Sequence, residues 1–297
     1  MSMQQGTGLP CVLRYVPDCV ARGIRQLPEH QQAQLQEIRL RVRQLPRIYD
    51  GREEQPLQGC EPLGQAQLQA CLKAACADSL YSFQRELSEG FVTVEGGNRI
   101  GFCGNAVIRN GEVETIRYVS SINIRIAKQV IGCGQALYNK LFAGSRQSVL
   151  ILGPPGSGKT TMLRDLCRLL GSRYRLSLVD ERGELAACRQ GVPMHELGPM
   201  TDVLDGYPKA KGMQIALRVM TPDYLVCDEL GSEAETAAVL ASMNSGVSLL
   251  ATAHAGSLTQ AERRPQLRIL LEAGVFRWAV LLEGNGHIAG MQRVGHD

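Results

Sequence analysis

The sequence predicts an α/β protein in which a small α+β domain precedes a domain built on a parallel central sheet. Two observations predict this fold class. Apolar runs of strand length alternate with helical patterns over the second half of the chain, and a glycine-rich segment joins the first of those runs to a helix. Because the strands of a parallel sheet are buried on both faces, continuous apolar runs separated by helices favour that architecture. We expect the two domains to span residues 1–130 and 131–297.

The first domain is expected to mix short strands with helices. Residues 29–37 and 65–77 have helical spacing, whereas residues 37–43 alternate apolar and charged side chains as a half-buried strand does. Further strand-like pieces follow at 90–94, 99–104, 107–108, 112–114 and 121–126. Turn signals at Glu95–Asn98 and Arg109–Gly111 indicate hairpins between some of these pieces.

The composition is that of an ordinary globular protein, with 297 residues, 44% hydrophobic and 21% charged residues and a net charge of +3. That charge is too small to argue for a nucleic-acid partner. The ten cysteines include no Cys-x-x-Cys pair and no secretory signal precedes them, so we expect reduced thiols in a cytoplasmic protein. No run approaches 18 apolar residues, so any membrane association is expected to be peripheral and to come through partners.

A complete phosphate-binding loop follows the apolar run 148–152 and opens into the helical pattern 161–170. It reads Gly153-Pro154-Pro155-Gly156-Ser157-Gly158-Lys159-Thr160. Its glycines let backbone N–H groups surround phosphates, Lys159 can bridge the β- and γ-oxygens, and the Thr160 hydroxyl can ligate Mg²⁺. We therefore expect residues 153–161, Thr161 included, to bind a nucleoside triphosphate in a P-loop NTPase domain of the RecA/AAA-like type.

An acidic pair ends the apolar run 224–228. Asp228 can hold the Mg²⁺ shell there, and Glu229, one step on, can polarise an attacking water. The pair supplies what a hydrolase needs, whereas a kinase needs its acceptor beside the γ-phosphate. We assign Asp228 to the metal and Glu229 to water activation; a helix-capping acidic pair is the alternative.

Three further positions are candidates for the same site. Asp180, Glu181 and Glu184 follow another sheet strand, and of these we assign Glu181 to Mg²⁺, although a structural salt-bridge cluster explains the three equally well. His254 lies two residues beyond the strand-like run 247–252 and could sense the γ-phosphate; an ordinary core or surface histidine is the alternative. Arg218, or Arg125 in the first domain, could offset transition-state charge in a neighbouring subunit, although for either arginine alone a structural ion pair is the better explanation.

Taken together, several segments form a set that resembles the secretion-ATPase superfamily, which powers type II and type IV secretion and pilus retraction. The segments are Leu217-Arg218, Pro222-Asp223, Asp228-Glu229-Leu230-Gly231, Glu235, Met243-Asn244-Ser245-Gly246 and Thr252-Ala253-His254-Ala255. The Asp180–Glu184 cluster is similar to the acidic box of that superfamily and His254 to its histidine box. One departure is that many of these motors have Gly-Glu where this chain has Asp228-Glu229.

Within that superfamily, the chain is most similar to the stage III sporulation protein AA family of endospore-forming bacteria, over about residues 35–282. The segments that carry this resemblance are Tyr81-Ser82-Phe83, Glu86-Leu87, Gly90, Gly96–Gly101, Ser121–Ala127, Asp180–Ala186 and Thr201–Gly206. The resemblance implies a cytosolic ATPase that uses ATP and Mg²⁺ and forms a homo-hexameric ring. It also implies action at the base of the mother cell–forespore channel, with the other proteins of that channel complex as partners.

Two other functions remain open at this point. A nucleic-acid-binding ATPase would need a basic stripe interleaved with aromatics, and the chain has only 5% aromatic residues, so we expect no nucleic acid. An assembly scaffold that binds ATP with little turnover would have the same motifs as a slow motor.

Overall fold

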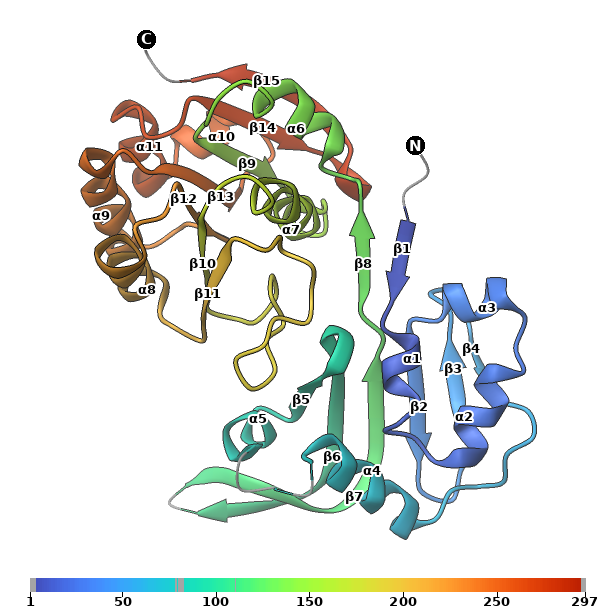
Figure 1. The fold of residues 1–297 in the computed structure, drawn as a ribbon. Coiled ribbons are helices and arrows are strands. Elements are labelled where there is room, and N and C mark those ends of the chain that lie inside the picture. The colour runs from blue at the N-terminus through green and yellow to red at the C-terminus, as the bar shows by residue number, and fades with distance from the viewer. Residues whose placement is uncertain (1–3, 78, 80–82, 110, 295–297) are drawn as a thin grey trace. The chain divides into compact units, whose positions relative to one another are not determined.

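The structure is a computed structural model that describes the 297 residues except 1–3, 78, 80–82, 110 and 295–297 (Figure 1). Contacts divide the chain into two compact units, residues 6–129 and residues 130–297 together with 1–5. Tyr81 and Ser82 of the family resemblance and Asn110 of the expected hairpin turn lie outside the described residues.

The unit of residues 6–129 has one antiparallel sheet of six strands in the order β4-β3-β2-β7-β6-β5. The strands are β2 (Glu37–Arg41), β3 (Arg47–Tyr49), β4 (Glu54–Pro56), β5 (Phe91–Val94), β6 (Asn98–Arg109) and β7 (Glu112–Arg125). The helices are α1 (Leu9–Val12), α2 (Asp18–Arg25), α3 (Glu29–Gln34), α4 (Gln65–Ala75) and α5 (Gln84–Ser88). The expected short strand pieces between 99 and 126 are continuous here, as the long pair β6 and β7.

Alternation of apolar and polar side chains gives this sheet one buried face. Along β2, Ile38 and Leu40 are fully buried while Glu37, Arg39 and Arg41 are only half-buried. The buried side chains pack with those of α2 and α4 in a single core. A separate two-stranded sheet pairs β1 (Gln4–Thr7) with β8 (Lys128–Ile131).

The unit that contains residues 130–297 has a seven-stranded sheet in the order β11-β10-β12-β13-β9-β14-β15. All neighbouring strands are parallel except the last pair. The strands are β9 (Val149–Gly153), β10 (Leu176–Asp180), β11 (Thr201–Asp205), β12 (Tyr224–Cys227), β13 (Ser248–His254), β14 (Trp278–Leu282) and β15 (Ile288–Arg293). The helices are α6 (Gln135–Leu141), α7 (Lys159–Leu170), α8 (Lys209–Ile215), α9 (Glu233–Ser242), α10 (Leu258–Glu262) and α11 (Pro265–Glu272).

Helices cover both faces of this sheet, as its apolar strands predict. On one face, side chains of α6 and α7 pack on residues such as Ile151 and Val226; on the other, α8, α9 and α11 pack on residues such as Leu150 and Leu225. In Figure 1, α8 and α9 lie to the left of the strands and α7 to the right. The mixed α/β fold with a largely parallel sheet is therefore as the sequence predicts.

Parallel pairing brings the sequence motifs to one edge of the sheet. β9, β12 and β13 are adjacent, and their carboxyl ends lead into the glycine-rich loop, Asp228 and His254. In the register of β13 with β9, His254 stands opposite Gly153. Open α/β sheets bind ligands at this edge, outside the carboxyl ends of their strands.

No helix among the described residues combines the length and the apolar character that crossing a membrane requires.

Candidate functional site

The glycine-rich loop turns from β9 into α7 with two residues in the left-handed backbone region, Gly156 at φ 73° and Gly158 at φ 92°. A Cβ on Gly158 would lie 2.9 Å from the backbone nitrogen of Gly286, so a side chain is excluded there by space as well as by conformation. The loop is fixed to the β14–β15 connection, because Gly286 N–H donates to Ser157 O at 2.8 Å. These contacts with Gly286 fix the backbone of the glycine-rich loop at Ser157 and Gly158.

Thr160 and Asp228 meet across the site although they are far apart in the chain. The Thr160 hydroxyl donates to Asp228 Oδ2 at 2.6 Å, and the Thr252 hydroxyl donates to Asp228 Oδ1. Thr252 is fully buried in β13, and its oxygen also accepts the Glu229 N–H at 2.8 Å. One threonine of β13 therefore orients both residues of the acidic pair.

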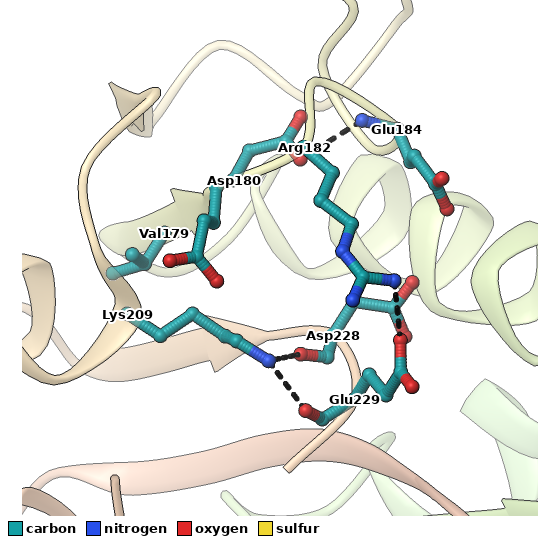
Figure 2. Close-up of a pocket in the computed structure, with 8 residues that line it drawn as sticks. Val179, Asp180, Arg182, Glu184, Lys209, Asp228 and Glu229 are labelled. Carbon is teal, nitrogen blue, oxygen red and sulfur yellow. Dashed lines mark hydrogen bonds and ion pairs between the residues drawn. The ribbon is translucent and has the colours of Figure 1, made fainter. Parts of the chain in front are cut away.

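Glu229 is held in an unusual conformation at the end of β12. Its φ is 52°, in the left-handed region that residues with a side chain seldom adopt. Its carboxylate accepts from Arg182 Nη1 at 2.9 Å through Oε2 and lies 3.3 Å from His254 Nε2 through Oε1. Figure 2 shows Arg182 reaching this carboxylate from the loop after β10. Strained backbone of this kind persists only where neighbouring contacts fix it.

Lys159 and Glu229 are linked through His254. Lys159 Nζ lies 3.2 Å from His254 Nδ1, and it donates to the carbonyls of Gly153 and Pro154 at 2.9 and 2.8 Å. With a hydrogen on Nε2 and none on Nδ1, the imidazole accepts from Lys159 and donates to Glu229. Burial lowers the pKa of the Lys159 ammonium below its usual value, and the carboxylates of Asp228 and Glu229 offset part of that shift.

The acidic cluster after β10 divides into different environments. Asp180 is buried and its carboxylate accepts three backbone N–H groups, those of Glu184, Leu185 and Ala186, at 2.7–3.0 Å. It therefore shapes the loop that follows β10 and has few lone pairs left for a metal. Glu181 and Glu184 are exposed, and both line a cavity with Asp228 and Glu229; Glu184 and the acidic pair are labelled in Figure 2.

Arg218 is the sequence candidate that stays outside this group. It lies on a π-helical turn, η3 (Ala216–Met220), where it is exposed, and it is not among the residues that line the cavity beside Asp228. Arg125, the other arginine considered, belongs to β7 and keeps 69% of its side chain exposed. A role for either in a neighbouring subunit's site stays a prediction.

Oxygen ligands suited to Mg²⁺ are present where the sequence predicts them. The Thr160 hydroxyl and the Asp228 carboxylate are hard donors that are already in contact. Over the described parts of the chain, no three or more His, Cys, Asp or Glu side chains are grouped to hold a metal ion. In nucleotide sites, Mg²⁺ takes one or two protein ligands and fills the rest of its shell with phosphate oxygens and water.

The loop also has an unpaired polar group that a phosphate would suit. Ser157 Oγ is buried, and no described residue offers it a hydrogen-bond partner. Buried hydroxyls are usually paired, so one without a partner in a phosphate-binding loop is consistent with a ligand contact.

Comparison with known proteins decides the family. A model of the family described as sporulation stage III, protein AA, matches residues 15–295. The stage III sporulation protein AA of Bacillus subtilis (strain 168) is 35% identical over 271 residues, which cover 89% of this chain and 88% of that protein. The chain belongs to the stage III sporulation protein AA family.

Two solved structures share the fold of this member of the stage III sporulation protein AA family. The pilus retraction motor PilT, solved with bound ADP, has a TM-score of 0.59 and 17% sequence identity. The alignment covers 85% of this chain and 76% of the PilT chain. The Legionella pneumophila ATPase DotB has a TM-score of 0.55 and 15% sequence identity. The alignment covers 90% of this chain and 76% of the DotB chain. At these identities the likeness establishes the fold.

Two residues of this site make contacts that no pattern in the sequence indicates. Lys209, at the start of α8, donates to main-chain carbonyls of the acidic pair, and Arg182 is bound to Glu229. One feature of the sequence could have indicated a special role for Lys209. It directly follows Pro208 in the first turn of a helix, where a positive charge opposes the helix dipole. Arg182 stood in the acidic cluster, but nothing in its spacing indicated a contact with Glu229.

Proposed function

We propose that this chain is a Mg²⁺-dependent ATP hydrolase of the secretion-ATPase type, which energises or assembles the mother cell–forespore channel during sporulation. The observation that carries the proposal is the contact of Thr160 with Asp228 at the mouth of the phosphate-binding loop, with Glu229 beside it. Family membership supports the sporulation context, and the fold it shares with ATPases supports the chemistry.

Each group of the site has a separate task in this proposal. The Lys159 ammonium and the backbone N–H groups of residues 153–161, other than the two prolines at 154 and 155, bind the phosphates, for which Lys159 leaves the carbonyls it now contacts. Thr160 and Asp228 would hold Mg²⁺, with Glu181 as a candidate for its outer shell; the ion would offset the charge of the phosphate oxygens.

Glu229 orients the attacking water and accepts its proton at a carboxylate oxygen. His254 connects the phosphate-binding ammonium to that carboxylate, since it lies within 3.3 Å of both. It can therefore report the loss of the γ-phosphate to Glu229. Arg218 or Arg125 would act in a neighbouring subunit's site.

A homo-hexameric, cytoplasmic ring, bound at the membrane through the other proteins of the channel complex, completes the proposal. It is tested by sedimentation with a non-hydrolysable ATP analogue: a nucleotide-dependent hexamer is expected, and a chain that stays monomeric contradicts the ring. Nucleic acid has no place in this function.

The chemistry is tested by Glu229→Gln. Because the amide cannot accept the proton of water but keeps the shape of the side chain, ATP affinity is expected to stay within about threefold of the unchanged protein while kcat falls by about 100-fold or more. Affinity is measured by titration with a fluorescent ATP analogue and turnover by phosphate release. A variant that hydrolyses ATP at the normal rate would remove Glu229 from its assigned role.

A further inference from the structure

A lysine outside the known motifs holds the main chain of the acidic pair. Lys209 Nζ donates to Asp228 O at 3.2 Å and to Glu229 O, as Figure 2 shows, and it also lies 3.3 Å from Glu235 Oε1. One ammonium thus meets three oxygens, which uses all three of its donors.

Both charges of this group are largely withdrawn from water. The side chains of Lys209 and Glu235 are each only 11% exposed. A buried lysine is rare unless it is paired, and Lys209 also stands in the first turn of α8, where the helix dipole disfavours a cation. The burial of this charge and its unfavourable position in the helix dipole both fail to stabilise α8 itself. Departures from local rules of this kind concentrate at functional sites.

Glu235 ties the same group to α9. Its Oε2 accepts the backbone N–H groups of Gly231 and Ser232, at 2.8 and 3.1 Å, in the capping box that begins α9. Burial alone would raise the pKa of this carboxyl, but those N–H groups and Lys209 outweigh it, and the pKa lies below its usual range. The carboxylate is therefore ionised and a full counterion for Lys209.

The backbone between β12 and α9 is consequently pinned from two sides. From β13, Thr252 accepts the Glu229 N–H and its carbonyl accepts the Leu230 N–H at 2.8 Å. From α8, Lys209 binds the carbonyls of residues 228 and 229. Glu229 is the residue with the left-handed backbone at φ 52°, and its conformation sets the direction of its carboxylate.

We infer that Lys209 is a positioning residue for Glu229: its ammonium, whose charge Glu235 balances, holds residue 229 in the strained conformation that aims the carboxylate into the site. The inference rests on the proposed ATP hydrolysis. It predicts an effect on kcat with ATP affinity retained, because Lys209 contacts the backbone of the acidic pair and none of the residues of the phosphate-binding loop.

The test is the double variant Lys209→Met with Glu235→Gln. It removes both buried charges together, and the Gln amide oxygen can still accept from Gly231 and Ser232, so folding is expected to persist with a change in Tm of about 4 °C or less. ATP affinity should match the unchanged protein, while kcat falls by about 10–100-fold, the usual cost of losing a positioning contact. Lys211→Met, an exposed lysine of the same helix, is the matched control and should leave both quantities unchanged.

Two results would overturn the inference. The first is normal turnover in the folded double variant, which would mean that Lys209 serves only to neutralise Glu235. The second comes from Glu235→Gln alone, a variant that also serves if the double variant fails to fold. In this variant Lys209 keeps its hydrogen bonds to the carbonyls of residues 228 and 229, so kcat should stay within about threefold of the unchanged protein. A tenfold loss of kcat with intact ATP affinity would mean that the Lys209–Glu235 ion pair, and not the carbonyl contacts, supports turnover. If the unchanged protein and Lys211→Met both lacked turnover, the proposed function itself would fall.

Discussion

Glu229 and its neighbours illustrate how a single side chain is aimed by contacts that come from three separate parts of the fold: β13, α8 and the loop after β10. Its N–H is bound from β13, its carbonyl from α8, and its carboxylate by Arg182 and His254. The left-handed backbone at this position costs about 1–3 kcal/mol in other contexts, so the surrounding bonds must exceed that strain. The carboxylate direction is therefore a property of the assembled sheet edge.

Thr252 offers a test at this scale. Thr252→Val keeps the volume but leaves the Glu229 N–H without its acceptor and Asp228 Oδ1 without its donor, so we expect a loss of about 1–2 kcal/mol in stability and of about 10–100-fold in kcat. Thr252→Ser keeps the hydroxyl and is the control. The measurements are thermal unfolding and phosphate release; equal turnover in the two variants would show that the hydroxyl does not orient the acidic pair.

Among the elements, the connection from β10 to β11 depends on buried polar groups. Asp180 accepts three backbone N–H groups at its start, and the Arg164 guanidinium of α7 donates to the carbonyls of Glu184 and Leu185. His195 lies further along the same connection, where its N–H donates to Ala186 O at 3.3 Å. Burial, and then the charge of Arg164, lower the pKa of His195 to about 3.

That shift makes stability depend on pH. In the folded chain, the lowered pKa keeps His195 neutral down to about pH 3, whereas in the unfolded chain it binds a proton below its ordinary pKa of about 6.5. The free energy of unfolding therefore falls as the pH drops from about 6.5 toward 3. Because the imidazole keeps some contact with water, we expect about 1 kcal/mol lost by pH 5. Chemical denaturation at pH 7 and pH 5 measures it. His195→Gln should reduce the loss and His287→Gln, an exposed histidine, should not; an unchanged loss in His195→Gln contradicts the assignment.

Most of the sheet was predictable, because a buried parallel strand leaves a continuous apolar run such as Val149–Gly153. β11 was not: only Leu204 of Thr201–Asp205 is buried, so an edge strand of this kind has no such run. The short pieces expected between 99 and 126 are continuous strands, since exposed residues there interrupt the apolar pattern without ending the pairing.

The site, like the sheet, has residues that a sequence pattern predicts and contacts that no pattern predicts. Lys159, Thr160, Asp228, Glu229 and His254 carry recognisable spacing at the ends of strands, and the fold brings them together. The contacts of Lys209, Arg182 and Asp180 depend on how loops from different strands turn toward one another. No local pattern encodes such a contact.

For the whole molecule, the family and the fold are established, and the proposed function is that the edge of the parallel sheet binds and hydrolyses Mg·ATP. The unit with residues 130–297 carries the entire phosphate-binding loop and acidic pair, so every group named in the chemistry apart from a neighbour's arginine belongs to one unit.

The most direct test is phosphate release by the purified full-length chain at millimolar ATP, first with Mg²⁺ and then with excess EDTA, beside Lys159→Ala. The account predicts turnover that disappears on removal of Mg²⁺ and falls by about 100-fold or more in the variant, because that lysine binds the phosphates. Release by the unchanged protein that is no faster than that of Lys159→Ala, or that is the same with and without Mg²⁺, would contradict it.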